Sequence, residues 1–400
     1  MPETSRHHQV VVIGGGNGGI SVAARLRREG VADLALIDPN DDHFYKPLFS
    51  HVAGGTARAS ITVRPQRDVI PKGVRWIQDA VTSIDPDARA LTLQGGDRVT
   101  YDHVIVCPGI QQDWDRVPGL VDALATPSVA SNYRFDLAAK ASLLLRDVKG
   151  GTVVFTQPPG DASCAGAAQK PMYQACDYWR AIGVLDRIRV VMVVPTSTVF
   201  GIPAIDQELE RKIAEYGIEL HTRSELLDVD AAAGVVVIGG PGGAERISYD
   251  VLHVEPPQSA PDWLAESTLA DAADEGGFVE VDTATLRHPR YPNVWALGDA
   301  AATSNSKCGG ALRKQTYVLA KNLVAVLGGK APTSRYDGYG VCPMTVSRST
   351  VVWAEFDAEG ELDPTIPFWK TMYRESRLSW IFDRRVLPWV YWNLILTGRV

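Results

Sequence analysis

The chain opens with an apolar run that leads directly into a glycine-rich turn. Residues 10–13 are all apolar, the motif Gly14-x-Gly16-x-x-Gly19 follows them, and residues 20–29 suit a helix. A second apolar run over residues 34–37 ends at Asp38. Strand, glycines, helix, strand and acid in this order predict a dinucleotide-binding βαβ unit.

Each part of this unit has a physical role in binding a nucleotide. Gly14 permits the tight turn, Gly16 lets the backbone approach a pyrophosphate, and Gly19 lets the helix lie close to the sheet. The free N–H groups and the dipole of the helix N-terminus favour an anion at that point. Asp38 is expected to accept hydrogen bonds from the adenosine ribose.

Further strands and helices alternate along the rest of the chain. Residues 74–100 alternate short strands with turns, which predicts a β-meander, and a strand over 101–107 ends at Pro108-Gly109. A second α/β unit begins at Gly151, with strands over 152–156, 188–194 and 219–222 and helices over 171–182 and 205–216. A later strand ends in Gly298-Asp299 and precedes a helix over 310–327.

This order predicts an α/β protein with two Rossmann-like dinucleotide-binding domains, the second inserted in the first. The first domain, an FAD-binding one, takes residues 1–150 and 285–330, the second takes 151–284, and 331–400 form a C-terminal segment. This is the layout of flavoproteins with two dinucleotide-binding domains. In such a protein Gly109 is expected to end a strand beside the flavin. Asp299 reaches the ribityl chain or the flavin-side phosphate, although a helix N-cap is the alternative role.

The second domain lacks a glycine fingerprint of its own. Its first strand leads into residues 156–166, where Pro158 and Pro159 remove backbone donors that a phosphate would need. The glycine-rich stretch 239–243 precedes no helix and is typical of a hairpin turn. The second domain is therefore predicted to have the shape of a nucleotide binder without a nicotinamide site.

Composition limits the class of protein and its surroundings. A chain of 400 residues with 45% hydrophobic and 22% charged residues is typical of a soluble globular protein with two or three domains. The net charge of −7 argues against nucleic acid as a partner. The five cysteines do not suggest a secreted disulfide framework, the first nine residues do not resemble a signal peptide, and no metal site is expected. No run of 18 apolar residues predicts a membrane-spanning helix.

Two cysteines are candidates for redox chemistry. Cys164 lies just upstream of a predicted helix, where a thiol pKa is lowered, and Lys170 adds positive charge nearby. Cys342 lies 178 residues further on, a spacing from which no redox motif can be read, so buried inert cysteines are the alternative. Cys107 and Cys176 are predicted to be inert. The position of Cys308 is compatible with either an inert or a reactive role.

Several stretches together resemble one family. They are His43-Phe44-Tyr45-Lys46-Pro47, the stretch from Cys164 to Lys170, Tyr249-Asp250-Val251-Leu252-His253-Val254, Tyr291-Pro292-Asn293-Val294 and Tyr336-Asp337-Gly338-Tyr339. With them the chain is similar to sulfide:quinone oxidoreductases over nearly its whole length. The sub-group that includes the mitochondrial enzyme is the most similar.

The resemblance implies a set of site residues. Cys164 and Cys342 become the catalytic redox pair, bridged in the resting enzyme. The expected FAD-binding residues are Gly14, Gly16, Asn17, Gly18, Gly19, Asp38, Lys46, Pro47, Val81, Gly109, Asp299, Lys307 and Gln315. Gln315 is expected to contact the flavin or the quinone. Lys46 stands where the family often has glutamine, which puts its detailed role in doubt, and Cys308 departs from the family pattern. As a third sulfur-handling residue, Cys308 would match another sub-group.

The implied activity is oxidation of hydrogen sulfide to sulfane sulfur, with electrons passed through FAD to a membrane quinone, either ubiquinone or menaquinone. A thiol, sulfite or sulfide is expected to accept the sulfur. The enzyme is expected at the cytoplasmic face of a bacterial cell membrane as a peripheral protein. The alternatives are an NAD(P)H:quinone reductase and a membrane-associated redox sensor without turnover.

The C-terminal residues 376–396 interleave aromatic and aliphatic side chains with arginines. Such a helix is expected to lie in the membrane interface. Packing of the helix on the protein core is an equally weighted alternative. The expected membrane-facing side chains are Trp380, Ile381, Trp389, Trp392 and Leu396, and the arginines expected to contact headgroups are Arg377, Arg384 and Arg385.

Overall fold

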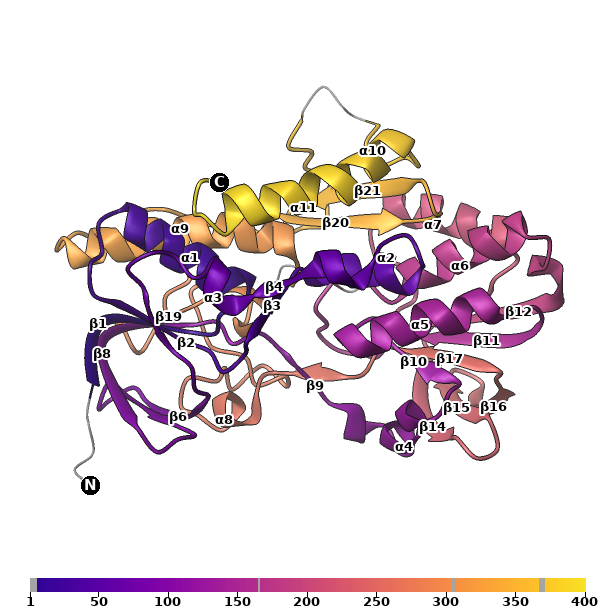
Figure 1. Ribbon diagram of the computed structural model, residues 1–400, viewed down its shortest axis with the longest axis horizontal. Helices are drawn as coiled ribbons and strands as arrows, with labels where there is room; N and C mark the ends of the chain where they lie inside the picture. Colours follow the sequence, from indigo (N-terminus) through magenta and orange to yellow (C-terminus); the bar gives the residue numbers. More distant parts are fainter. Residues whose placement is uncertain (1–5, 165, 304–306, 367–370) are drawn as a thin grey trace.

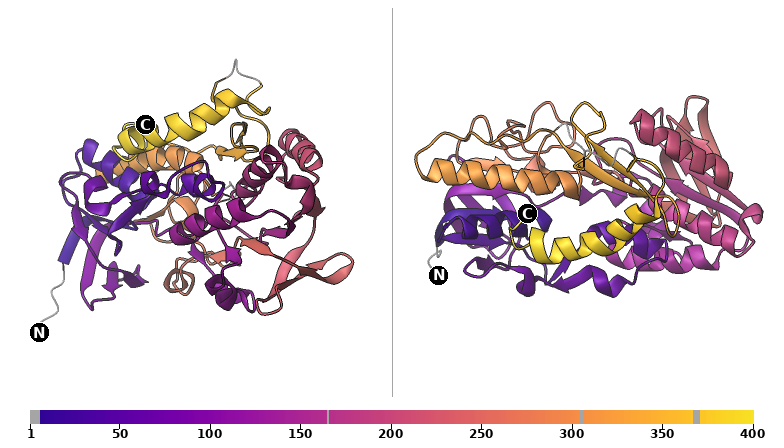
Figure 2. Two further views of the ribbon diagram at one scale, coloured as in Figure 1. Left: turned by 45° about the vertical axis from the view of Figure 1, so that its right-hand side comes forward. Right: turned by 90° about the horizontal axis from the view of Figure 1, so that it is seen from above.

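A computed structural model describes residues 6–164, 166–303, 307–366 and 371–400. Ala165, within the stretch from Cys164 to Lys170, and Asn305 and Ser306, beside Cys308, lie outside the described residues. Two α/β units lie side by side, and the C-terminal segment runs across the top of both (Figures 1 and 2).

The first unit is built on a seven-stranded sheet. Its strands in spatial order are β5 (Arg75–Ile77), β2 (Leu34–Ile37), β1 (Arg6–Ile13), β8 (Arg98–Val106), β7 (Ala90–Leu93) and β6 (Val81–Asp85), with β19 (Val294–Ala296) also paired to β8. Helices α1 (Asn17–Arg28) and α9 (Gly309–Leu327) pack against each other over one face of this sheet. Residues 10–13 of β1 and residues 104–106 of β8 are all buried, as expected where helices and loops cover both faces of a parallel sheet.

The predicted β-meander over residues 74–100 is only partly correct. Strand β5 pairs in parallel with β2 and therefore belongs to the main sheet. Only β6, β7 and β8 form antiparallel neighbours. Strand β8 is long enough to pair with β7 through its first half and with β19 through its second half. One strand thus serves both the meander and the parallel sheet.

The second unit has a five-stranded parallel sheet. Its strands in spatial order are β10 (Val129–Ala130), β17 (Val251–Val254), β11 (Gly151–Thr156), β12 (Ile188–Val193) and β13 (Glu219–His221), and its helices are α5 (Phe135–Asp147), α6 (Gln169–Ala181) and α7 (Pro203–Tyr216). Strand β10 comes from residues before Gly151, at which the second α/β unit was expected to begin. The observed bounds of α6 and α7 differ from the predicted helices by two residues at most.

Smaller elements complete the two units. The glycine-rich stretch 239–243 forms a hairpin turn between β15 and β16, as predicted. A short antiparallel pair, β9 with β18, joins the connections between the two sheets. The bounds are β3 (Asp42–Phe44), β4 (Val63–Pro65), β9 (Gln111–Gln112), β14 (Glu225–Asp230), β15 (Val235–Gly240), β16 (Gly243–Ser248), β18 (Gln258–Ser259), α2 (Phe49–Ala53), α3 (Gln66–Val69), α4 (Leu120–Ala125) and α8 (Asp262–Ala265).

The C-terminal segment consists of a hairpin and a helical tail. The hairpin is β20 (Gly340–Thr345) with β21 (Val351–Phe356), and the tail is α10 (Arg377–Ile381) and α11 (Leu387–Val390), each followed by a short π-helical stretch, Phe382–Val386 and Tyr391–Ile395. Among the described residues, no helix has the length and apolarity needed to cross a bilayer.

One face of the tail packs on the first unit. The Tyr391 hydroxyl lies 2.6 Å from Nε2 of His43, and the Arg64 guanidinium lies 4.2 Å from the Trp392 ring centroid. Trp392 and Leu396 are buried in the core beside β1 and α1, so the expectation that they face a membrane is wrong. The burial of large apolar surface here outweighs any gain from lipid contact, because the core site is already enclosed.

The opposite face of the tail is exposed. Leu378 and Trp389 are each 57% exposed, and Ile381 is 49% exposed. Arg384 is held by the protein, because its Nε donates to the Thr56 carbonyl at 3.1 Å, whereas Arg377 and Arg385 are exposed. The tail therefore has a core-packed face and a free apolar face, and each of the two sequence interpretations describes one of them.

Trp392→Ala and Trp389→Ala form a matched pair that tests this division. Trp392→Ala should lower the free energy of unfolding by about 3–5 kcal/mol, because it empties a packed aromatic site. Trp389→Ala should change it by only about 0.5 kcal/mol. Urea denaturation of the two purified variants measures both values, and equal losses would contradict the assigned faces.

Candidate active site

The two candidate redox cysteines meet at the junction of the second unit and the C-terminal hairpin. Cys164 lies in the loop between β11 and α6, and Cys342 lies on β20. Their Sγ atoms are 3.4 Å apart. Cys342 is 1% exposed and packs in the same core as Met344, whose Sδ is 3.7 Å from the Cys342 Sγ. A small movement would bring the two sulfurs to the roughly 2.05 Å of a disulfide.

The two thiols have opposite acidities. The hydrogen bond from Cys342 and then the charge of Lys170 lower the Cys164 pKa to about 6, despite the opposing effect of burial. The Lys170 Nζ lies 3.5 Å from the Cys164 Sγ. The pKa of Cys342 is raised well above its usual value, first by its hydrogen bond to Cys164 and then by burial. Cys164 is thus the thiolate of the pair, and Cys342 is the hydrogen-bond donor.

Of the two causes predicted for this acidity, the charge of Lys170 is present and the start of a helix is not the main one. Helix α6 begins only at Gln169, and the groups that lower the pKa are the side chains of Cys342 and Lys170. A helix dipole acts mainly within the first turn, so contacts at 3.4 and 3.5 Å have the larger effect.

The backbone of Cys164 is held in an unusual conformation. Its φ is 58°, in the left-handed region that non-glycine residues adopt only at a cost and often at functional sites. The Cys164 N–H donates to the Lys307 carbonyl at 2.8 Å, and the Cys164 carbonyl accepts from the Ala167 N–H at 2.7 Å. The Tyr133 hydroxyl lies 3.3 Å from the Ser163 carbonyl oxygen and 3.4 Å from that of Cys164. These contacts offset the backbone strain.

A buried carboxyl group supports this loop from behind, and the sequence reasoning missed it. Glu255 follows β17 and is 2% exposed. Its Oε1 accepts from the Gln258 side chain at 3.0 Å, and the Gln258 oxygen accepts from the Ser163 N–H at 3.1 Å. Burial raises the Glu255 pKa well above its usual value, which favours the neutral acid. An acid directly after an apolar strand, at the edge where parallel strands end, was the available signal.

The glycine-rich turn has the shape of a nucleotide cradle. A Cβ on Gly19 would lie 1.7 Å from the Gly14 carbonyl oxygen, and one on Gly14 would lie 2.3 Å from that of Cys107. A Cβ on Gly16 would meet no protein atom within 4 Å. No side chain caps the first N–H groups of α1. This open space before uncapped donors fits the pyrophosphate of a dinucleotide.

Asp38 and Asp299 occupy the two ends of this cradle. Asp38 ends β2 and accepts from the Gly15 N–H at 2.6 Å and from the Asn40 N–H at 2.8 Å. Asp299 is half-buried near Lys307 and Lys46, partial desolvation raises its pKa, and its side chain is hydrogen-bonded to Ser163. The turn expected near the flavin therefore touches the residue before Cys164. The residues present fit FAD.

The other predicted cofactor residues differ in their surroundings. Lys46 and Pro47 are exposed, Gly109 has a φ of 86° with open space around it, and Val81 is buried among apolar residues of the first sheet. Asn17 accepts from the Ser21 hydroxyl, and a Cβ on Gly18 would lie 2.7 Å from the Leu297 side chain.

Lys307 and Gln315 have protein partners. The Lys307 Nζ donates to the Ala301 carbonyl at 3.0 Å and lies 3.4 Å from an Asp161 carboxylate oxygen. The Gln315 side-chain oxygen accepts from the Gly298 N–H at 2.8 Å. Both side chains therefore brace the segment around Asp299.

The remaining cysteines differ in position from the pair. Burial raises the pKa of both Cys107 and Cys176, which fits inert core residues. Cys308 precedes α9, and its Sγ accepts from the Val341 N–H at 3.4 Å. Burial also raises the Cys308 pKa. Cys308 is therefore next to the strand that carries Cys342. Its raised pKa favours the unreactive thiol over the thiolate.

Comparisons with known proteins agree with this geometry. The pyridine nucleotide-disulphide oxidoreductase family model matches residues 8–324. The chain is 35% identical to the mitochondrial sulfide:quinone oxidoreductase of Mus musculus, over 98% of this chain and 87% of that one. The Dictyostelium discoideum counterpart is 33% identical over 98% of this chain and 86% of that one. The sulfide:quinone oxidoreductase structure from Aquifex aeolicus has a TM-score of 0.82 at 20% identity, covering 98% and 92% of the two chains, and thus shares the fold.

The fold and the cysteine pair define a flavoprotein of the pyridine nucleotide-disulphide oxidoreductase class, and its cofactor is FAD. Within that class, the chain belongs to the sulfide:quinone oxidoreductase family. The two-domain α/β fold predicted from the sequence is confirmed.

Gly16→Ala and Gly19→Ala should separate cofactor binding from folding. The Gly16 Cβ would enter only the space expected for the pyrophosphate, so Gly16→Ala should fold normally and lose most of its FAD. Gly19→Ala should lower stability itself, because its Cβ would collide with the backbone of Gly14. Flavin absorbance per protein and the apoprotein melting temperature measure the two effects. Full FAD loading of Gly16→Ala would contradict the assigned cradle.

Lys170→Met should raise the Cys164 pKa. In the reduced protein, alkylation of Cys164 by iodoacetamide should rise with pH around a midpoint below the usual thiol pKa, because only the thiolate reacts. Without Lys170 the midpoint should move upward by about 1–3 pH units. Mass spectrometry of the Cys164 peptide follows the reaction, and Lys149→Met, at an exposed lysine, is the control. An unchanged midpoint would exclude Lys170 as the cause.

Proposed function

We propose that this chain oxidises hydrogen sulfide to sulfane sulfur at Cys164 and Cys342 and transfers the two electrons through FAD to a membrane quinone. The observation that carries this proposal is the 3.4 Å contact between the two sulfurs, from segments far apart in the chain. Sulfide as the electron donor and a quinone as the electron acceptor are proposed from the names of the mitochondrial relatives.

The acidities of the two thiols give the sulfur chemistry a direction. In a disulfide between them, the better leaving group is Cys164, because the Lys170 Nζ lies 3.5 Å from its sulfur and stabilises the departing thiolate. Hydrosulfide therefore attacks the Cys342 sulfur, a new S–S bond forms there, and the Cys164–Cys342 bond breaks. Cys342 then carries a persulfide and Cys164 carries the negative charge. A thiol, sulfite or a second sulfide removes the outer sulfur from Cys342.

The chain positions these groups against its cofactor site. Bound FAD supplies the two-electron chemistry that connects the cysteine pair to a quinone. Asp299 lies in the turn at that site, and its hydrogen bond to Ser163 links the turn to the Cys164 loop. Glu255, Gln258 and Tyr133 hold the same loop from the other side. The protein thereby keeps the Cys164 sulfur in a defined place relative to the flavin turn.

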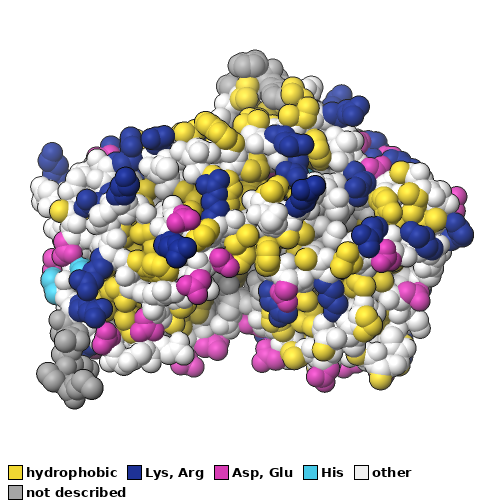
Figure 3. Space-filling view, in the orientation of Figure 1, with side chains coloured by type: hydrophobic (Ala, Val, Ile, Leu, Met, Phe, Trp, Pro, Cys, Tyr) yellow, Lys and Arg dark blue, Asp and Glu magenta, His cyan; other side chains and the backbone are white. Residues whose placement is uncertain are grey.

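The exposed face of the helical tail is the proposed membrane contact. Hydrophobic side chains and Lys and Arg side chains occur together along the upper rim of the molecule in Figure 3, where Figure 1 shows α10 and α11. Leu378, Ile381 and Trp389 form the apolar part, with Arg377 beside them. Such a face binds the interface of a bilayer without crossing it. We place the enzyme on the cytoplasmic face of a bacterial cell membrane, with ubiquinone or menaquinone as acceptor.

An NAD(P)H:quinone reductase would need a nucleotide site in the second unit. The loop after β11 contains Pro158 and Pro159 where such a site requires backbone donors. The same loop carries Cys164, and the Tyr133 hydroxyl contacts it at Ser163. A redox sensor without turnover would not need the opposite acidities of the two thiols. The geometry therefore favours sulfide as the electron donor.

Sulfide-dependent quinone reduction by the FAD-loaded protein tests the proposal. Sulfide should reduce a soluble quinone rapidly, and NADH should not. Cys164→Ser and Cys342→Ser should each abolish the reaction, because the two sulfurs act in series. Cys107→Ala and Cys176→Ala should leave it largely intact, and Cys308→Ser should cost less than about tenfold. Rapid reduction by NADH, or near-normal turnover of either serine variant, would refute the assignment.

The membrane contact is tested by Leu378→Ser combined with Trp389→Ser. This variant should leave liposomes and show a higher KM for a long-tail quinone, because it removes two of the largest exposed apolar side chains. Its reduction by sulfide should be unchanged. Val121→Ser combined with Leu143→Ser removes comparable exposed side chains from α4 and α5 and should have no effect. Equal liposome binding by both double variants would exclude the tail as the anchor.

A further inference from the structure

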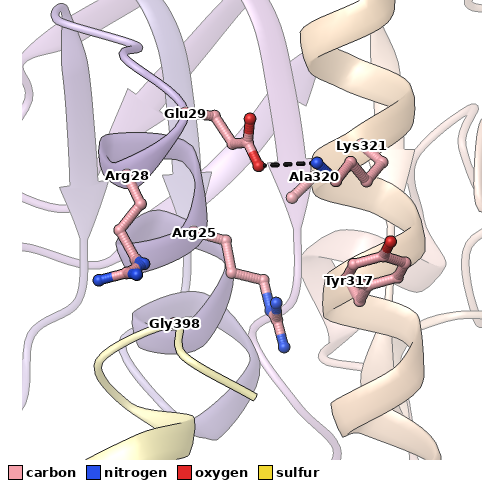
Figure 4. A pocket seen from close by; sticks show the side chains of 7 residues that line it. All are labelled: Arg25, Arg28, Glu29, Tyr317, Ala320, Lys321 and Gly398. Carbon is pink, nitrogen blue, oxygen red and sulfur yellow. Dashed lines mark hydrogen bonds and ion pairs between the residues drawn. The ribbon is translucent and has the colours of Figure 1, made fainter.

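A second cavity lies outside the cysteine site, between α1, α9 and the end of the helical tail (Figure 4). Its volume is about 180 Å³. The residues that line it are Arg25, Arg28, Glu29, Tyr317, Ala320, Lys321 and Gly398. Three of the seven carry a positive charge and one carries a negative charge.

The positive charge in this cavity lacks a matching acid. The Glu29 carboxylate already pairs with the Lys321 Nζ at 2.9 Å. The Arg25 pKa is lowered first by burial and then by the charges of Arg313 and Arg28, while Tyr317 and Glu29 act in the opposite direction. The Arg25 Nε is buried and has no hydrogen-bond partner among the described residues. A bound anion in the cavity would accept from guanidinium N–H groups and reduce the repulsion between the arginines.

We propose that this cavity binds a phosphate group, and specifically the headgroup phosphate of an anionic phospholipid. Arginine side chains bind phosphate through paired N–H donors, and Arg25 and Arg28 lie one turn apart on α1 with Tyr317 opposite. The Arg25 guanidinium carbon lies 5.5 Å from the Tyr317 ring centroid, which restricts its orientation.

The position of the cavity favours a lipid as the source of the phosphate. Gly398 forms one wall and packs so closely on α1 that a Cβ there would lie 2.7 Å from the Arg25 backbone nitrogen. The tail that ends at this wall presents Leu378, Ile381 and Trp389 to solvent. A bilayer against that apolar face would bring its headgroups to the level of the cavity. This choice of source rests on the membrane attachment proposed above.

A soluble short-chain lipid separates the cavity from the membrane contact. The probes are monomeric dihexanoyl-phosphatidylglycerol, its zwitterionic phosphatidylcholine counterpart and inorganic phosphate. Each is titrated into the FAD-loaded protein, and the melting temperature is recorded, since a ligand that binds only the folded state raises it. The variants are Arg25→Gln with Arg28→Gln, and Arg28→Gln alone, which changes only an exposed side chain. Arg98→Gln with Arg246→Gln is the control at two other exposed arginines.

Phosphatidylglycerol should raise the melting temperature of the native protein and the control more than phosphatidylcholine or phosphate does. Its affinity should fall about tenfold or more in the double variant and by a smaller factor in Arg28→Gln. An equal response to inorganic phosphate would overturn the lipid assignment in favour of a free anion. An unchanged affinity in both cavity variants, or no response of the native protein, would overturn the site. This titration contains no bilayer, so it tests the cavity without the tail as a membrane anchor. The liposome experiment described above tests the anchor separately.

Discussion

The contact between Cys164 and Cys342 is the constraint on which the site depends. It exists because the hairpin β20–β21 packs its apolar face against α6 and α7 in the core of the second unit, with Cys342, Met344 and Val352 among the buried residues. The same packing brings the Cys342 sulfur to the end of the loop that carries Cys164. A domain with the shape of a nucleotide binder thus has a sulfur pair beside the position of its missing phosphate turn. The C-terminal segment is therefore part of the candidate active site.

Two opposing effects set the charge state of that pair. Burial disfavours any thiolate, and it keeps Cys107, Cys176 and Cys308 protonated. Two opposite unit charges about 4 Å apart attract with roughly 4 kcal/mol at an effective dielectric constant of 20, which can offset such burial. Lys170 provides this attraction, and the Cys342 thiol adds a hydrogen bond to the same sulfur. Only Cys164 has both partners, so only Cys164 is acidic.

The helical tail has two faces in different surroundings. Its aromatic residues alternate between a face enclosed by the first unit and a face in solvent. Trp392 and Tyr391 fix the tail to the body, while Trp389 is free. The His51 Nε2 lies 2.9 Å from an Asp383 carboxylate oxygen and ties the middle of the tail to α2. The tail is thus held in place while its apolar side remains available for a membrane.

The sequence by itself determined the local elements and the first nucleotide turn. The apolar periods predicted α7, α9, most strands of the first sheet and β11, β12 and β13 of the second, and the spacing of Gly14, Gly16 and Gly19 predicted the cradle. These signals are local, because a helix or a βαβ turn depends on residues within a few positions of one another. The same rule explains why residues 74–77 were assigned to the meander: their pairing with β2 involves a strand about forty residues earlier.

The distances in the candidate active site and the faces of the tail depend on packing that no local pattern predicts. Cys164 and Cys342 were paired from a family resemblance, since a separation of 178 positions carries no spacing signal. Glu255 was missed, because its role comes from the burial and the contacts that β17 gives it. Trp392 and Trp389 look alike in an amphipathic pattern, and only the shape of the first unit determines which one is enclosed. Such choices depend on packing between segments far apart in the chain, and a local pattern of apolar and polar residues contains no record of them.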